Sequence, residues 1–172
     1  YWQTYLGMTI RKGVSEQYAR LEMRRRHTLI GSMAIHKGDA DGMICGTFGT
    51  TDLHLRYVDQ VLGKKQGANM YGAMNVLILP DGQLALLDTH VNEDPTAEQI
   101  AEMTMLAADE MQRFGITPYV ALVSHSNFGS SNNPSARKMR DALAILQERA
   151  PGLQVDGEMH GEVQEDRGGD EA

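Results

Sequence analysis

The chain contains few of the residues that mark specialised protein classes. Among 172 residues there is one cysteine, Cys45, so an internal disulfide is excluded. Cys45 lies in the apolar run at residues 43–45, which predicts a buried, reduced thiol rather than a nucleophile. The scarcity of cysteine therefore indicates a reducing compartment.

A long hydrophobic run is also missing. No stretch approaches the roughly 18 apolar residues that a membrane-spanning helix needs. The opening Tyr1-Trp2-Gln3 contains neither an initiator methionine nor the basic residues of a signal peptide. We therefore expect a cytoplasmic protein without a membrane segment, and a chain excised from a longer one. With 41% hydrophobic residues, it is long enough for one ordinary domain or for most of a larger one.

Positive charge is scarce overall but concentrated at one end of the chain, whose formal net charge is −7. Residues 1–38 hold seven basic and two acidic residues, whereas residues 157–172 hold six acidic residues and one basic residue. The basic run Arg24-Arg25-Arg26 has no interleaved aromatic residues, which argues against nucleic-acid binding. It favours a solvated helix face or a subunit contact. Residues 162–172 are acidic and poor in apolar residues, and we expect them to be disordered.

Hydrophobic periodicity predicts alternating helices and strands. A helix capped by Ser15 should run to about Lys37, and a helix opened by Pro95 and Thr96 should end near Gly115. The apolar face of this later helix is expected to contain Ile100, Met103, Ala107, Met111 and Phe114. The other expected elements are a buried strand at residues 42–46, a helix at 52–62, a hairpin of 73–79 with 84–88, strands at 119–123 and 153–156, and a helix at 135–150. This order predicts an α/β protein with a mostly parallel sheet flanked by helices.

A polar loop at residues 124–131 separates the expected strand at 119–123 from the helix after it. This strand–loop–helix arrangement is where α/β proteins bind ligands. The loop holds five hydroxyl or amide side chains and one glycine, which permits close approach of an anion, so it predicts a site for a phosphate-bearing ligand. An ordinary polar connection is the alternative, because no lysine stands where a P-loop needs one. The predicted ligand contacts are Ser124, Ser126, Asn127, Gly129, Ser130 and Ser131.

A second polar stretch follows the expected hairpin. Asp88, His90 and Asn92 would share one face if the chain is extended there. These side chains offer oxygen and nitrogen ligands to a metal, but no His-x-x-x-His pair or paired cysteines accompany them. We therefore expect them to line a ligand cleft, and we predict no metal site.

Several motifs, in their order along the chain, together resemble one family. They stand at residues 38–46, 88–98, 114–118, 124–131 and 155–161. In this order they resemble the phosphate acetyl/butyryltransferase family over residues 1–161. The resemblance is strongest to the C-terminal, phosphotransacetylase-like domain of bacterial NADP-dependent malic enzymes. It is carried there by Tyr-Trp-Gln-Thr-Tyr at residues 1–5, Ser-His-Ser-Asn-Phe-Gly-Ser-Ser at 124–131 and Glu-Met-His-Gly at 158–161.

The resemblance implies a fold and a function. The fold would be part of a two-lobed domain of the isocitrate/isopropylmalate dehydrogenase type. Its cleft would recognise acetyl-CoA, or a related CoA or phosphate ligand, as an effector of a malic enzyme that converts malate to pyruvate. The expected partners are the N-terminal malic-enzyme domain of the same polypeptide and further copies of the chain. NADP and a divalent metal would belong to that N-terminal domain, and this chain would hold no cofactor.

Two alternatives follow from the same resemblance. The chain would be a piece of a genuine phosphate acetyltransferase, which moves acetyl between phosphate and CoA, or an assembly module with an empty cleft. Family members carry their catalytic arginines, serine and aspartate beyond the position of Gly161, where residues 162–172 match nothing in the family. No catalytic residue is therefore expected in this chain.

Overall fold

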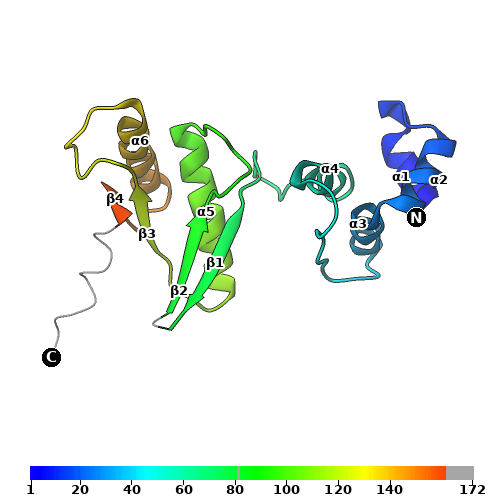
Figure 1. Ribbon diagram of the computed structural model, residues 1–172, viewed down its shortest axis with the longest axis horizontal. Helices are drawn as coiled ribbons and strands as arrows, with labels where there is room; N and C mark the ends of the chain where they lie inside the picture. Colours follow the sequence, from blue (N-terminus) through cyan, green and yellow to red (C-terminus); the bar gives the residue numbers. More distant parts are fainter. Residues whose placement is uncertain (81, 162–172) are drawn as a thin grey trace. The chain divides into compact units, whose positions relative to one another are not determined.

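The computed structural model describes residues 1–80 and 82–161, and the expected disorder of residues 162–172 falls outside them. The chain divides into two compact units, Tyr1–Gly67 and Ala68–Ala172 (Figure 1). The first is helical in the part described, and the second combines helices with parallel and antiparallel strands. The α/β class predicted from the sequence is therefore confirmed, although the described strands form one parallel and one antiparallel pair rather than a mostly parallel sheet.

The first unit contains four α-helices and one short 3₁₀ helix in its described residues. Two hydroxyl caps start helices in this unit: Ser15 Oγ accepts from Tyr18 N at 3.2 Å, as expected, and Thr50 Oγ1 accepts from Leu53 N at 3.4 Å. The core of the unit is formed by Tyr5, Ala19, Leu29, Met33, Tyr57 and Val61. The helices are α1 (Trp2–Thr9), η1 (Ile10–Lys12), α2 (Glu16–Arg25), α3 (His27–Lys37) and α4 (Thr51–Val61).

The prediction of one helix from Ser15 to Lys37 was wrong. Arg26 is extended, with φ −110° and ψ 96°, and separates α2 from α3. In one straight helix Ala19 and Met33 would lie about 21 Å apart along the axis. The break brings both of them into one hydrophobic cluster, which accounts for the change of direction.

The predicted buried strand at residues 42–46 is not formed. Ile44 is fully exposed, and Cys45, which was expected to be buried, is exposed as well. The described residues of the first unit contain no strand, so the backbone of this segment has nothing to pair with. An apolar run between glycines is thus left extended and open to solvent.

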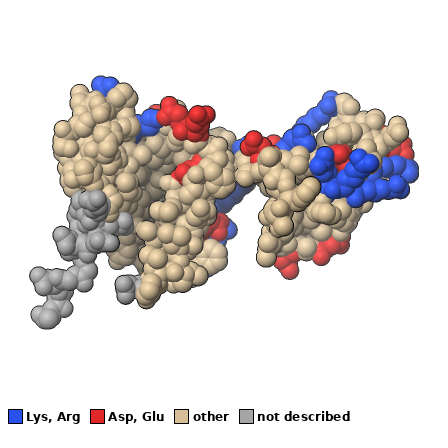
Figure 2. Space-filling model, viewed as in Figure 1, with Lys and Arg blue, Asp and Glu red and all other residues tan. Residues whose placement is uncertain are grey.

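Basic side chains gather on the surface of the first unit (Figure 2). Arg24 and Arg25 are exposed, in agreement with the predicted solvated helix face. Arg20 lies 4.0 Å from the centre of the Trp2 ring and forms an ion pair with Glu16 at 2.7 Å. These contacts hold the charged side chain of Arg20 against the helical surface.

The second unit contains two pairs of strands. The predicted hairpin is confirmed: β1 (Met74–Leu79) pairs antiparallel with β2 (Gly82–Leu87). The parallel pairing consists of β3 (Tyr119–Val123) and β4 (Gln154–Met159), joined through α6 (Pro134–Arg149). The isocitrate dehydrogenase-type detail of the fold stays a prediction.

Helices α5 (Ala97–Arg113) and α6 pack together; α6 lies against the parallel pair, and α5 also contacts β2. Their core contains Met70, Ile100, Ala101, Met103, Leu122, Ala142 and Leu146. Thr96 and Gln99 form the reciprocal capping box at the start of α5. Phe114 was expected on the buried face of α5 but is 72% exposed, because it lies at the C-cap, beyond the helical repeat. Over the described residues, no helix is long and apolar enough to cross a membrane.

An irregularity in β4 decides where one acidic side chain lies. Leu122 stands opposite Gly157, and Val123 stands opposite Met159, so Glu158 is the extra residue of a bulge. Bulges re-aim side chains at the ends of sheets. Here the bulge lies next to the polar loop that follows β3.

Candidate functional site

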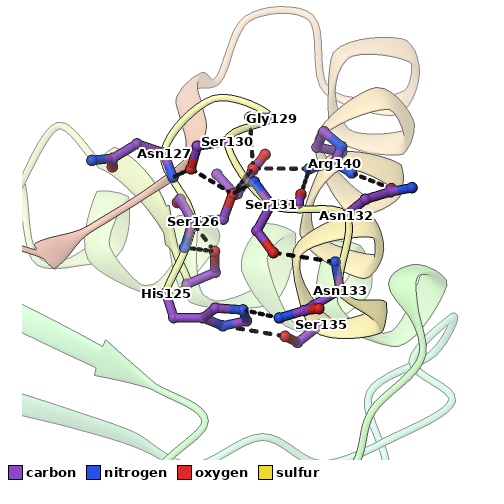
Figure 3. A network of polar contacts seen from close by, with 12 residues as sticks. His125, Ser126, Asn127, Gly129, Ser130, Ser131, Asn132, Asn133, Ser135 and Arg140 are labelled. Carbon is purple, nitrogen blue, oxygen red and sulfur yellow. Dashed lines mark hydrogen bonds and ion pairs between the residues drawn. The ribbon is translucent and has the colours of Figure 1, made fainter.

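The predicted strand–loop–helix is present. Strand β3 ends at Val123, the 124–131 loop follows, and α6 begins at Pro134. Phe128 and Gly129 have φ of 45° and 85°, in the left-handed region. The chain thereby turns back on itself within a few residues (Figure 3). The sequence predicted a glycine that lets an anion approach here, and the structure uses Gly129 for a left-handed turn.

The loop satisfies its own backbone donors. All six backbone N–H groups from Ser126 to Ser131 donate to acceptors in the loop or in Glu158. A ligand at this loop would therefore meet side chains rather than these N–H groups. The acceptors are Ser124 Oγ for Ser126, Ser130 Oγ for Asn127, the Glu158 carbonyl for Phe128, Glu158 Oε1 for Gly129, the Asn127 carbonyl for Ser130 and Ser126 Oγ for Ser131.

Glu158 is the buried centre of this arrangement. Its side chain is fully buried, and Oε1 accepts from Ser126 Oγ at 2.7 Å, Gly129 N at 2.8 Å and Arg140 Nη1 at 2.9 Å. Burial by itself raises the pKa of this carboxyl, but hydrogen bonds from Gly129, Ser126 and Arg140 outweigh burial and lower its pKa to about 2. Glu158 is therefore ionised at neutral pH and holds the loop through charge-assisted hydrogen bonds.

Arg140 connects the loop to α6. Besides Glu158, its Nη1 donates to the Ser131 carbonyl at 3.1 Å, and its Nη2 donates to Asn132 Oδ1 at 3.3 Å (Figure 3). The three acceptors come from β4 and from two positions of the connection. One guanidinium thus ties strand, loop and helix together.

His125 lies on the exposed side of the loop. Its Nε2 is 2.9 Å from Asn133 Nδ2, and its Nδ1 is 3.4 Å from Ser135 Oγ (Figure 3). The imidazole is held against the start of α6.

The second predicted cluster is organised differently. Asp88 Oδ1 accepts from Ala73 N at 2.9 Å, Oδ2 accepts from Asn92 N at 2.7 Å, and the Asn92 side chain donates to the Tyr71 carbonyl at 2.8 Å. Burial raises the pKa of Asp88, but the hydrogen bonds from Ala73 and Asn92 outweigh it, so the net pKa is lowered. His90 is exposed. The carboxylate therefore braces the chain after the hairpin.

The structure brings together the six predicted loop residues but does not join them to the second cluster. Among the described residues, Asp88, His90 and Asn92 form no hydrogen bond with the 124–131 loop. Asp94, at the end of the same stretch, forms an ion pair with Lys138 of α6. In the same part of the chain, no group of three His, Cys, Asp or Glu side chains is arranged to hold a metal.

Sequence reasoning missed Glu158 and Arg140 as site residues. Glu158 belongs to the Glu-Met-His-Gly motif at residues 158–161, which was noted only as part of a resemblance. The position of Arg140 in the predicted helix does not show whether its side chain points toward the loop. The available signal was an acidic and a basic residue, Glu158 and Arg140, in the two elements that follow the polar loop. The bulge in β4 that brings them together cannot be read from the sequence.

Known proteins with a similar sequence indicate the family of this chain. A profile of the family described as phosphate acetyl/butaryl transferase matches residues 1–164. The chain is 50% identical over 163 residues to the NADP-dependent malic enzyme of Salmonella typhimurium, covering 95% of this chain and 22% of the relative. It is 37% identical over 147 residues to the phosphate acetyltransferase of Nitratidesulfovibrio vulgaris, covering 86% and 21%. The chain thus spans about a fifth of the length of the curated relatives it matches.

A solved structure agrees with the sequence comparison. A phosphotransacetylase from Streptococcus pyogenes superposes with a TM-score of 0.78 at 28% identity, over 94% of this chain and 51% of that one. The predicted resemblance to the transferases and to NADP-dependent malic enzymes is therefore confirmed. Since the family profile matches nearly the whole chain, the protein belongs to the phosphate acetyl/butyryltransferase family.

Proposed function

We propose that this chain is the phosphotransacetylase-like part of an NADP-dependent malic enzyme, where it senses acetyl-CoA and contributes to assembly. The observation that carries the proposal is its 50% identity to a malic enzyme, against 37% to a phosphate acetyltransferase, over most of the chain. The parent reaction would be oxidative decarboxylation of malate to pyruvate in the cytoplasm. NADP and a divalent metal would be held by another part of the polypeptide, and the protein would be a homo-oligomer.

The 124–131 loop is the proposed effector site. It carries hydroxyl and amide side chains on a backbone held by Glu158, so little conformational entropy is lost when a ligand binds. The proposed contacts are the side chains of Ser124, Asn127, Ser130 and Ser131, whereas Gly129 and the buried Ser126 hold the loop in shape through Glu158. That Asp88, His90 and Asn92 line a ligand cleft stays a prediction. Regulation requires only that acetyl-CoA bind two states of the parent enzyme with different affinity, typically by a factor of about 5 to 150.

The test uses the full polypeptide that contains this chain. Malate-dependent NADPH formation is measured while acetyl-CoA is titrated, in the wild type and in Gly129→Val. The wild-type rate should change with acetyl-CoA, and Gly129→Val should weaken the response because φ of 85° disfavours a branched side chain. Gly152→Val is the matched control, since Gly152 is exposed and has open space around it. A wild-type rate independent of acetyl-CoA would contradict the proposal.

The second candidate is a phosphate acetyltransferase, favoured by the likeness to a solved phosphotransacetylase. Acetyl transfer needs donors that stabilise charge on the carbonyl and phosphate oxygens, and removing one such donor typically costs about 10² to 10³ in rate. The backbone donors of the loop are already bonded, and the arginines that the family resemblance assigns to catalysis belong beyond the position of Gly161. We therefore expect no acetyl-CoA formation from acetyl phosphate and CoA by this chain. Turnover that disappears in His125→Ala would make it a self-sufficient transferase.

A further inference from the structure

The guanidinium of Arg140 has donors left after its contacts within the protein. A guanidinium carries five N–H groups. Nη1 uses two of them, on Glu158 Oε1 at 2.9 Å and the Ser131 carbonyl at 3.1 Å, and Nη2 uses one on Asn132 Oδ1 at 3.3 Å. The Nε–H group and one N–H of Nη2 have no acceptor among the described residues. Two donors of a fixed cation are therefore unused.

The unused donors belong to a group that is fixed on one side and open on the other. The Arg140 side chain is 32% exposed, whereas its partner Glu158 is fully buried. Nε and Nη2 lie along one edge of the planar group, a geometry that matches two oxygens of a phosphate. Because Glu158 and Ser131 already hold the guanidinium in place, a ligand need not immobilise it.

The surroundings of Arg140 favour an anion. Residues 124–133 contain no acidic side chain. The charge of Glu158 is distributed over hydrogen bonds from Ser126 Oγ and Gly129 N as well as Arg140. In Figure 3 Arg140 lies beside Asn132, whose side-chain amide is next to Nη2, whereas the hydroxyl of Ser131 points away toward Asn133. A phosphate is the simplest group that uses all of these donors.

We propose that Arg140 contacts a phosphate group of the CoA-type ligand, and that Glu158 is the positioning residue that fixes the guanidinium. The inference rests on the proposed function, because it assumes that such a ligand binds at the 124–131 loop. It names a contact that the predicted set of loop residues did not include.

The experiment compares two probes, CoA and pantetheine, which share the thiol arm; pantetheine lacks the phosphates of CoA together with its adenosine. Their dissociation constants are measured by calorimetry on the full chain, for the wild type and Arg140→Gln. The ratio of the pantetheine constant to the CoA constant should fall by about 10- to 100-fold in Arg140→Gln, the usual size of a charge-assisted hydrogen bond. A merely structural role would weaken both probes and leave the ratio unchanged.

Further variants keep the result decisive. Arg140→Lys retains the charge without the planar fork, so the ratio should fall by a smaller factor even if Arg140→Gln does not fold. Glu158→Gln should also lower the ratio, by less than Arg140→Gln. Arg149→Gln, exposed at the other end of α6, should leave it unchanged.

Wild-type protein that binds neither probe contradicts the proposed function itself. Wild-type binding with an unchanged ratio in a folded Arg140→Gln or Arg140→Lys overturns this inference alone.

Discussion

Two segments of this protein have the same sequence pattern but different structures. Residues 42–50 and residues 119–133 each consist of an apolar run, a polar turn with glycine and the start of a helix. The later segment forms β3, a compact loop and α6, whereas the earlier one forms no strand before α4 and leaves Ile44 and Phe48 exposed. Local pattern alone therefore does not decide which of the two becomes an ordered site.

The difference lies in the partners that the rest of each unit supplies. Strand β3 pairs with β4, and the bulge in β4 directs Glu158 to the donors of the loop. The described residues of the first unit offer residues 42–46 no neighbouring strand, and the buried carboxylate of this unit, Glu22, bonds to Tyr57 and Arg26 instead. A strand needs a pairing partner because its backbone groups are otherwise satisfied only by water. The comparison teaches that Glu158 and β4 give the 124–131 loop its fixed shape.

The largest effect is expected from removing Glu158. Glu158→Ala leaves Ser126 Oγ, Gly129 N and Arg140 without their shared acceptor and should destabilise the second unit by roughly 3 kcal/mol. The value lies at the low end for a broken buried pair because Arg140 is partly exposed. The only tryptophan, Trp2, lies in the first unit, so the measurement is hydrogen exchange of amides in β3 and β4. Glu148→Ala, exposed on α6, is the control, and equal protection in both variants would disprove the role of Glu158.

A smaller effect of the same carboxylate should appear in acid. The folded-state pKa of Glu158, about 2, lies below its ordinary value of 4.5, so its stabilising contribution is complete above about pH 4.5. That contribution should be lost as pH falls from about 4.5 to about 2. The measurement is the unfolding free energy against pH for the wild type and Glu158→Gln, which cannot titrate. The difference between the two should shrink over this window, and a constant difference would show that Glu158 is not ionised in the loop.

Gly129 tests the backbone of the loop. Gly129→Val should destabilise the second unit by about 1 to 2 kcal/mol, because φ of 85° is unfavourable for a branched residue although no atom would clash. The same substitution at Gly152 should cost less. Melting curves of the two variants, monitored by circular dichroism, give the comparison. Equal melting temperatures would mean that the loop relaxes without strain.

The smallest effect is expected in the segment that failed to become a strand. Ile44 is fully exposed, so Ile44→Ala should change stability by less than about 0.5 kcal/mol. Leu122→Ala, at the buried position of strand β3, is the matched deletion and should cost about 2 to 5 kcal/mol. Denaturant unfolding measures both. A loss at Ile44 as large as that at Leu122 would show that residues 42–46 are packed.

Sequence reasoning succeeded where local signals decide the structure. The caps at Ser15 and Thr96, the hairpin of β1 with β2, and the bounds of β3 follow from hydroxyl caps, turn residues and apolar runs. It failed where distant residues decide. Arg26 breaks a helix so that α2 and α3 share one core, and residues 42–46 lack a strand to pair with. The loop was predicted as a site, but its anchor Glu158 depends on a bulge that only strand pairing reveals.

The most direct test of the account is a titration of the isotope-labelled full chain with CoA, followed by amide resonances. If the loop held by Glu158 is the ligand site, the shifts should concentrate in residues 124–133 and near Arg140. Residues 46–51, the polar turn of the segment that formed no strand, should not move. Shifts confined to residues 46–51, with the 124–133 region unchanged, would contradict the proposal that the 124–131 loop, held in shape by Glu158 and β4, is the site.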